Sequence, residues 1–178
     1  MRGEEVQLFG AVAAGLTPPD ALVCHPGTHN KWARVEGGRV TAFRTVMTGE
    51  MFSLLQQRSI LSDWLGGAVE AGPAFLGGVR RGLTGEAVTA ELFSVRASIL
   101  LGRLAKEDAA SFTSGLLIGA DVRTGLREAE DGVVYVMGRP DLTALYAAAL
   151  LEAGRDSRQV DGEQAFLAGI TDIARHLS

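Results

Sequence analysis

The chain has 178 residues, of which 47% are hydrophobic and 21% charged, the balance of an ordinary soluble globular protein. Its formal net charge of −4 argues against a nucleic-acid binder and against a polybasic protein that binds membrane surfaces. The single cysteine, Cys24, excludes an internal disulfide, and the sequence has neither a signal-peptide pattern nor an apolar run of the ~18 residues that span a bilayer. We therefore expect a cytoplasmic protein with one sizeable core.

The first part of the chain is expected to contain a helix, a buried strand and a hairpin. In chain order, the expected elements are a helix over 4–14, a linker over 15–20, a strand over 21–25 and hairpin strands over 32–36 and 39–46. Gly37 and Gly38 lie between the last two runs, and a Gly-Gly pair between strand-like segments is a strong hairpin signal.

The remainder is mainly helical, with two further strands. The expected elements are helices over 50–58, 88–104, 106–130 and 142–153, strands over 132–137 and 157–160, and short helices and loops over 61–85. Gly115 and Gly119 share one helix face, where a neighbouring backbone could approach closely. Asp161 is expected to N-cap a final helix. The order predicts an α/β fold, a mixed sheet flanked by helices. The final helix is expected to bury an apolar stripe: Phe166, Ile170, Ile173 and Leu177.

Two segments with small polar residues are expected to meet at one end of the sheet and bind an anion such as phosphate. In the first, Gly27 turns the backbone, Thr28 adds a hydroxyl donor and Lys31 adds a positive charge. A plain turn with a solvent-exposed lysine explains the same pattern. The second segment is expected to be a loop that contains Thr45, Thr48 and Gly49. A threonine cap on the following helix is its alternative, and the two interpretations are compatible.

Other polar residues are ambiguous from sequence alone. Glu4 and Glu5 are candidate general bases, although acidic residues at a helix start more often interact with the helix dipole. His25 and His29 are better explained as loop-structuring residues than as metal ligands, because Pro26-Gly27 interrupts any helical spacing and no third ligand cluster is visible. No metal site is predicted from the residues themselves.

Several segments together resemble the 2-dehydro-3-deoxygalactonokinase family. They are MRGEEVQLFGA, PGTHNKWARVEGGRVTAFRTVMTGE, LFSVRASILLG, SFTSGLLIGADV and DGEQAFLAGI. The resemblance implies a ribonuclease-H-like lobe of the sugar kinase/Hsp70/actin fold, with a five-stranded mixed sheet. It also implies transfer of the γ-phosphate of ATP, with Mg²⁺, to the 6-hydroxyl of the sugar acid 2-dehydro-3-deoxy-D-galactonate.

The resemblance also implies roles for individual residues. The phosphate-binding loop would be Gly27, Thr28, His29, Asn30 and Lys31. The adenosine side would involve Gly138, Leu142 and Tyr146, and the substrate side Arg2. Glu4 or Glu5 would match a carboxylate base by position.

Members of this family are nearly twice as long and begin with another lobe. The resemblance therefore implies an interlobe helix and linker over 1–19 and a C-terminal lobe over 20–178, without the N-terminal lobe. We expect an exposed apolar face, self-association or homo-oligomers, and little activity from this chain alone. A non-catalytic module that binds nucleotide or sugar acid, and a kinase for another sugar acid, stay open as alternatives.

Overall fold

The computed structural model describes residues 3–85, 87–127, 129 and 131–177, and its centre is one five-stranded sheet. The strands are β1 (Ala21–His25), β2 (Asn30–Glu36), β3 (Arg39–Val46), β4 (Val134–Gly138) and β5 (Ser157–Asp161). Their spatial order is β3-β2-β1-β4-β5; β1, β2 and β3 are antiparallel, while β4 and β5 run parallel to β1. The predicted mixed five-stranded sheet with an antiparallel hairpin is confirmed.

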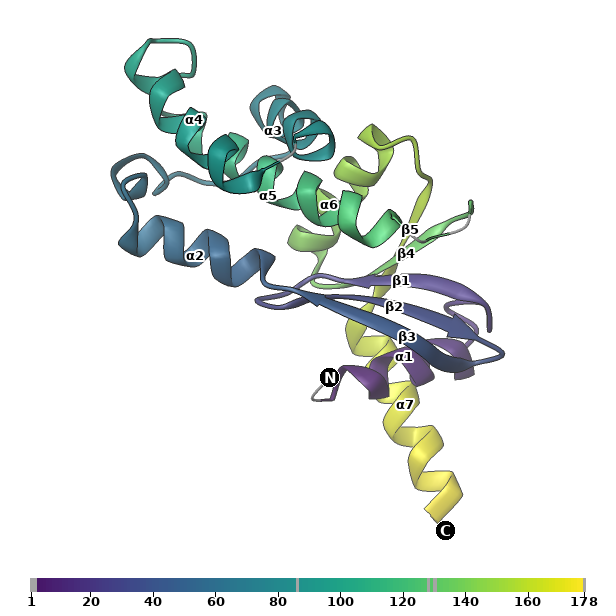
Figure 1. The fold of residues 1–178 in the computed structure, drawn as a ribbon. Helices are drawn as coiled ribbons and strands as arrows, with labels where there is room; N and C mark the ends of the chain where they lie inside the picture. Colours follow the sequence, from purple (N-terminus) through teal and green to yellow (C-terminus); the bar gives the residue numbers. More distant parts are fainter. Residues whose placement is uncertain (1–2, 86, 128, 130, 178) are drawn as a thin grey trace.

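Helices cover both faces of the sheet. They are α1 (Glu4–Ala13), α2 (Thr48–Arg58), α3 (Pro73–Thr84), α4 (Val88–Leu100), α5 (Ala109–Leu126), α6 (Pro140–Glu152) and α7 (Gly162–Leu177), with a 3₁₀ turn η1 (Ser62–Trp64). Figure 1 shows α1 and α7 together on one side, and α3, α5 and α6 on the other. The helices α2 and α4 extend beyond the edge of the sheet.

Strand alternation produces a core on each face of the sheet, because successive side chains point to opposite sides. On β1, Val23 packs in the cluster that contains Leu8 of α1 and Ala165 of α7. Its neighbour Cys24 packs in the opposite cluster, with residues of α3, α5 and α6. A third cluster joins α4, α5 and the turn around η1.

Glycines allow α3 and α5 to pack backbone against backbone. A Cβ on Gly115 would lie 2.1 Å from the carbonyl oxygen of Phe75, and one on Gly119 would lie 2.3 Å from that of Val79. The expected close approach at Gly115 and Gly119 is therefore confirmed. The expectation of short helices over 61–85 is wrong in part, since 73–84 is one 12-residue helix, α3. Its glycines match those of α5, a tertiary contact that local sequence does not reveal.

Local signals for turns and caps agree with the structure. Gly37 and Gly38 have φ values of 55° and 75°, the left-handed conformation that a tight hairpin turn requires. Asp161, the last residue of β5, accepts hydrogen bonds from the backbone amides of Glu163 and Gln164 at 2.8 and 3.1 Å. The predicted N-cap of the final helix is confirmed.

The predicted buried stripe of the final helix is wrong. Phe166, Ile170 and Ile173 are 43–48% exposed, and the side chain of Leu177 lies outside the described part of the chain. The helix α7 instead packs on α1 through small residues, since a Cβ on Gly169 would lie 2.1 Å from the carbonyl oxygen of Val6. Its larger apolar side chains therefore face outward, as an exposed apolar face.

Candidate functional site

The segment between β1 and β2 meets the first turn of α2, as the sequence predicted. A Cβ on Gly49 would lie 2.5 Å from the carbonyl oxygen of Gly27, so the two backbones touch. The backbone amide of Glu50 donates to the carbonyl oxygen of Thr28 at 2.9 Å. The side chains of His29 and Glu50 interact at 2.5 Å between Nε2 and Oε2. The two segments form one unit.

The second segment is a strand followed directly by a helix, rather than the predicted loop. Strand β3 continues to Val46, and α2 begins at Thr48 after the single residue Met47. Thr45 lies on β3, where it pairs with Lys31 of β2. The loop prediction is wrong because ladder hydrogen bonds extend β3. The segment therefore offers an anion a helix N-terminus rather than a loop, and one amide of its first turn, that of Glu50, already donates to Thr28.

Lys31 and Glu4 form an ion pair between Nζ and Oε1 that joins β2 to α1. Their side chains are only 13% and 21% exposed, so the pair is largely shielded from water. The predicted cation and one predicted base are thus brought together. Glu5 accepts a hydrogen bond from the backbone amide of Gly3 at 3.0 Å, a contact typical of a helix start. Arg2 lies outside the described residues.

His25 connects the end of β1 to α1 and α7. Its Nε2 lies 2.6 Å from Oε1 of Gln7, and Nε2 of Gln7 donates to the carbonyl oxygen of Gly162 at 2.9 Å. Because the amide oxygen only accepts, Nε2 of His25 is assigned the proton. Burial lowers the pKa of His25, and this effect exceeds the opposing attraction of Glu4. The imidazole is therefore a neutral, structural group here.

Sequence reasoning missed Asp121, a buried carboxylate on α5 with 2% of its surface exposed. Its Oδ2 accepts from Asn30 Nδ2 at 2.8 Å, Tyr146 OH at 2.6 Å and Thr48 Oγ1, and its Oδ1 accepts from Trp32 Nε1 at 2.8 Å. Burial raises the pKa of Asp121, while these hydrogen bonds oppose the rise. The one feature of the sequence that could have indicated Asp121 is the presence of an acidic residue within a helix of small and apolar residues.

The expected adenosine side is only partly accessible. A hollow of about 680 Å³ opens beside the ends of β1, β4 and β5, and Gly138 lines it, whereas Leu142 is half-buried and is not among its lining residues. Tyr146 is 3% exposed and its hydroxyl donates to Asp121. The prediction that Tyr146 faces adenosine is wrong, because the helix α6 turns this ring into the core.

The hollow borders the segment between β1 and β2. A Cβ on Gly138 would lie 3.6 Å from the carbonyl oxygen of Pro26 and 3.9 Å from Thr143 Cγ2. Gly138 has φ 151°, a conformation that side chains rarely adopt. The other polar residues that line the hollow are Gln7, His25, Arg139, Gln159, Asp161 and Glu163.

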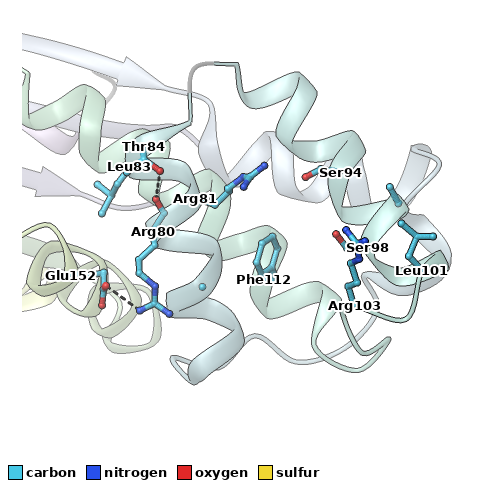
Figure 2. A pocket seen from close by; sticks show the side chains of 12 residues that line it. Arg80, Arg81, Leu83, Thr84, Ser94, Ser98, Leu101, Arg103, Phe112 and Glu152 are labelled. Atoms are coloured by element: carbon cyan, nitrogen blue, oxygen red, sulfur yellow. Dashed lines mark hydrogen bonds and ion pairs between the residues drawn. The ribbon is translucent and has the colours of Figure 1, made fainter.

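A second hollow, of about 780 Å³, lies among α3, α4, α5 and α6 and contains none of the predicted site residues. Figure 2 shows that Arg80 reaches across to Glu152, and the two groups are 3.0 Å apart. Arg81 pairs with Glu91, and both arginine side chains are more than half exposed. Arg80 and Arg81 thus belong to a solvated face of the helix α3.

The described residues hold no ready-made metal centre. Within 3–85, 87–127, 129 and 131–177, no group of three or more His, Cys, Asp and Glu side chains is placed to bind a metal ion. In the same part of the chain, no helix has the length and apolar character needed to cross a membrane.

Comparison with solved structures first defines the class. A crystal structure described as that of a candidate 2-dehydro-3-deoxygalactonokinase from Sinorhizobium meliloti matches with a TM-score of 0.91 and 42% identity, over 99% of this chain and 60% of that chain. Component A of (R)-2-hydroxyglutaryl-CoA dehydratase from Acidaminococcus fermentans matches with a TM-score of 0.53 at 15% identity, a likeness of fold alone. The fold is therefore that of a kinase-related α/β protein.

The family model described as 2-keto-3-deoxy-galactonokinase matches residues 1–173, and the chain belongs to this family. The 2-dehydro-3-deoxygalactonokinase of Escherichia coli (strain K12) is 42% identical over 176 residues, which are 98% of this chain and 59% of that protein. A candidate for the same enzyme in Rhizobium meliloti (strain 1021) is also 42% identical, over 98% of this chain and 58% of the relative. The chain thus spans about three-fifths of the length of these relatives.

Proposed function

We propose that this chain is the C-terminal, ribonuclease-H-like lobe of an ATP-dependent kinase for 2-dehydro-3-deoxy-D-galactonate. Membership of the family supports the reaction, and the order β3-β2-β1-β4-β5 supports the actin-like lobe. The observation that carries the proposal is that Gly138 and Pro26 line the same hollow. The hollow at the strand ends is therefore continuous with the loop that meets α2.

The phosphate groups of ATP would lie against Gly27, Thr28 and the first turn of α2. No atom lies within 4 Å of a Cβ built on Gly27, which leaves open space above this backbone. Thr28 and His29 are exposed. The helix α2 has 11 residues, and its dipole favours an anion near its N-terminus. These features fit a phosphate chain.

The nucleoside would occupy the hollow beside Gly138. At about 680 Å³ it has the size of a typical small-molecule site. The side chain of Arg139 is 74% exposed and pairs with Asp141 at 2.7 Å. We propose that the exposed face of its planar guanidinium lies against the base. Leu142, in the first turn of α6, is the nearby apolar residue in this proposal.

Lys31 and Glu4 would act together in the transfer step. An incoming phosphate competes with Glu4 for the ammonium group of Lys31, because both are anions. In this proposal the carboxylate of Glu4 then accepts the proton of the attacking 6-hydroxyl, whose oxygen bonds to the γ-phosphorus as ADP leaves. Glu4 is a better candidate than Glu5, whose carboxylate holds the backbone amide of Gly3. Arg2 stays a proposed substrate contact.

ATP supplies the phosphoryl group in this proposal, and the described residues fit its phosphate and nucleoside parts. Among the described residues, no group of three or more His, Cys, Asp and Glu side chains is placed to hold a metal ion. Mg²⁺ commonly binds through one or two carboxylates and the substrate phosphates. We therefore assign no step of the reaction to a metal held by this chain.

We also propose that residues 1–19 form the helix and linker between the two lobes. The exposed apolar face of α7, formed by Phe166, Leu167, Ile170 and Ile173, is 43–59% exposed, and Phe9 of α1 is 42% exposed. Such a contiguous apolar surface is typical of a docking face. It supports the packing of a second lobe on α1 and α7.

The test compares the chain alone with a chimera that carries the preceding segment of the Escherichia coli relative. ADP release is measured with 2-dehydro-3-deoxy-D-galactonate and with related sugar acids. We expect turnover with this sugar acid from the chimera and almost none from the chain alone, because phosphoryl transfer needs groups on both sides of a cleft. If neither protein shows turnover although both still bind ADP, the result would favour the non-catalytic binding module. Faster turnover with another sugar acid would reassign the substrate.

A further inference from the structure

We propose that Asp121 is a positioning residue that couples the phosphate-binding backbone to the nucleoside hollow. This inference rests on the proposed function and deepens it. Asp121 touches neither subsite directly. It acts through the side chains that donate hydrogen bonds to it from three different elements.

Two of these donors lie next to the residues proposed to bind phosphate. Asn30 directly follows His29 at the start of β2, and Thr48 directly precedes Gly49 at the start of α2. Both side chains donate to Oδ2 of Asp121. One carboxylate oxygen therefore fixes the two backbones whose contact forms the phosphate site.

A third donor leads to the nucleoside hollow. Tyr146 lies on α6, whose first residue, Pro140, lines the hollow, and its hydroxyl donates to Asp121 at 2.6 Å. Trp32 Nε1 donates a hydrogen bond to the other carboxylate oxygen of Asp121, Oδ1, at 2.8 Å. Displacement of Asp121 would therefore move supports of both subsites, which a residue that only fills space would not do.

The chemistry requires a carboxylate at this position. An ionised carboxylate has about four lone-pair sites and accepts without donating, and four donors surround Asp121. Removing the acceptor leaves buried donors without a partner, which costs more than the loss of a hydrogen bond in water. The Asn30 amide is held in the same way, since its Oδ1 accepts from Cys24 Sγ at 3.6 Å.

The substitution Asp121→Asn keeps the volume and changes the donor pattern. The new NH2 group faces a donor in either orientation of the amide: Trp32 Nε1 at the position of Oδ1, or the three donors at the position of Oδ2. Because Asn30 and Trp32 both lie on β2, either orientation removes a hydrogen bond to this strand and shifts its start. The backbone of Gly27 and Thr28 should move with it. Thr113→Val is a matched control on α5, because Thr113 is fully buried and its hydroxyl has no partner among the described residues.

The experiment uses the full 178-residue chain. Calorimetry measures binding of ADP and of tripolyphosphate, and NMR follows the backbone amides of Gly27, Thr28 and Gly49. For Asp121→Asn, we expect both ligands to bind at least about tenfold more weakly, which corresponds to ~1.4 kcal/mol, and all three amide resonances to shift. Thr113→Val should change neither readout.

Tyr146→Phe is a milder variant that keeps the experiment informative if Asp121→Asn does not fold. It removes only the donor from α6, so ADP binding should weaken severalfold while tripolyphosphate binding stays within twofold. Unchanged ADP binding would overturn the link between Asp121 and the nucleoside hollow.

Unchanged amide resonances of Gly27, Thr28 and Gly49 in a folded Asp121→Asn protein would overturn the positioning role. So would ADP and tripolyphosphate affinities within twofold of those of the unsubstituted chain. If the unsubstituted chain binds neither ligand, the proposed function fails. The amide resonances then still decide whether Asp121 positions this backbone.

Discussion

The glycine contacts between α3 and α5 predict opposite effects from two neighbouring substitutions. Gly77 and Gly78 are adjacent on α3, and replacing either with alanine improves helix propensity by about 1 kcal/mol. A Cβ on Gly77 would lie 3.6 Å from Phe112 Cε2, an ordinary contact. A Cβ on Gly78 would lie 2.0 Å from the carbonyl oxygen of Phe112 and 2.8 Å from the amide nitrogen of Leu116.

The clash at Gly78 is with backbone, which cannot rotate away, so α3 must separate from α5. Overpacking of this kind costs ~1–3 kcal/mol, and a backbone clash is expected at the upper end of that range. After subtracting the gain in propensity, Gly78→Ala should lower the free energy of unfolding by about 2 kcal/mol. Gly77→Ala should raise it by about 1 kcal/mol.

Urea unfolding of both variants, followed by circular dichroism, measures the difference. We expect midpoints on opposite sides of that of the unsubstituted chain, with similar m-values. If both variants changed stability in the same direction and by a similar amount, the close packing of α3 on α5 would be refuted.

Three further predictions concern the site. The Cβ of Gly49→Ala would lie 2.5 Å from the carbonyl oxygen of Gly27, so this variant should bind ADP at least about tenfold more weakly in calorimetry. Gly66→Ala is the control, because no atom lies within 4 Å of its Cβ, and it should not weaken ADP binding. Equal ADP affinities of the two variants would contradict the contact between Gly49 and Gly27. Burial lowers the pKa of His25, so the unfolded chain binds a proton there more readily than the folded chain. The free energy of unfolding measured in urea should therefore fall as pH drops below about 6.5. His25→Gln should reduce this pH dependence of stability, and an unchanged pH dependence would exclude His25 as its source. In the chimera, Glu4→Gln should abolish ADP release while ADP affinity stays within threefold; retained turnover would remove Glu4 as the base.

The sequence predicted the elements that depend on local signals. Apolar runs and the Gly37-Gly38 turn located β1 and the hairpin, and the predicted sheet has the observed mixed character. The meeting of the segments at Gly27 and Gly49 was also predictable, because both follow strand ends at the same edge. Strand β3 was assigned correctly, although pairing with β2 carries Thr45 into the ladder rather than a loop.

The errors arise where tertiary contacts decide the outcome. Tyr146 has the same local pattern whether its ring faces a ligand or the core, and only its hydrogen bond to Asp121 distinguishes the two. Asp121 itself could not be recognised as important, since its donors come from β2, α2 and α6, far apart in the sequence. The outward apolar side chains of α7 follow from its glycine contact with α1, which periodicity does not reveal.

The most direct test of the central claim is an ADP titration of the 178-residue chain followed by NMR of its backbone amides. The account predicts that the largest shifts occur at Gly27, Thr28, Gly49 and Gly138, where the loop between β1 and β2, the helix α2 and the hollow meet. Shifts concentrated instead around Gly77 and Arg80, in the hollow shown in Figure 2, would contradict it, as would the absence of any shift at saturating ADP.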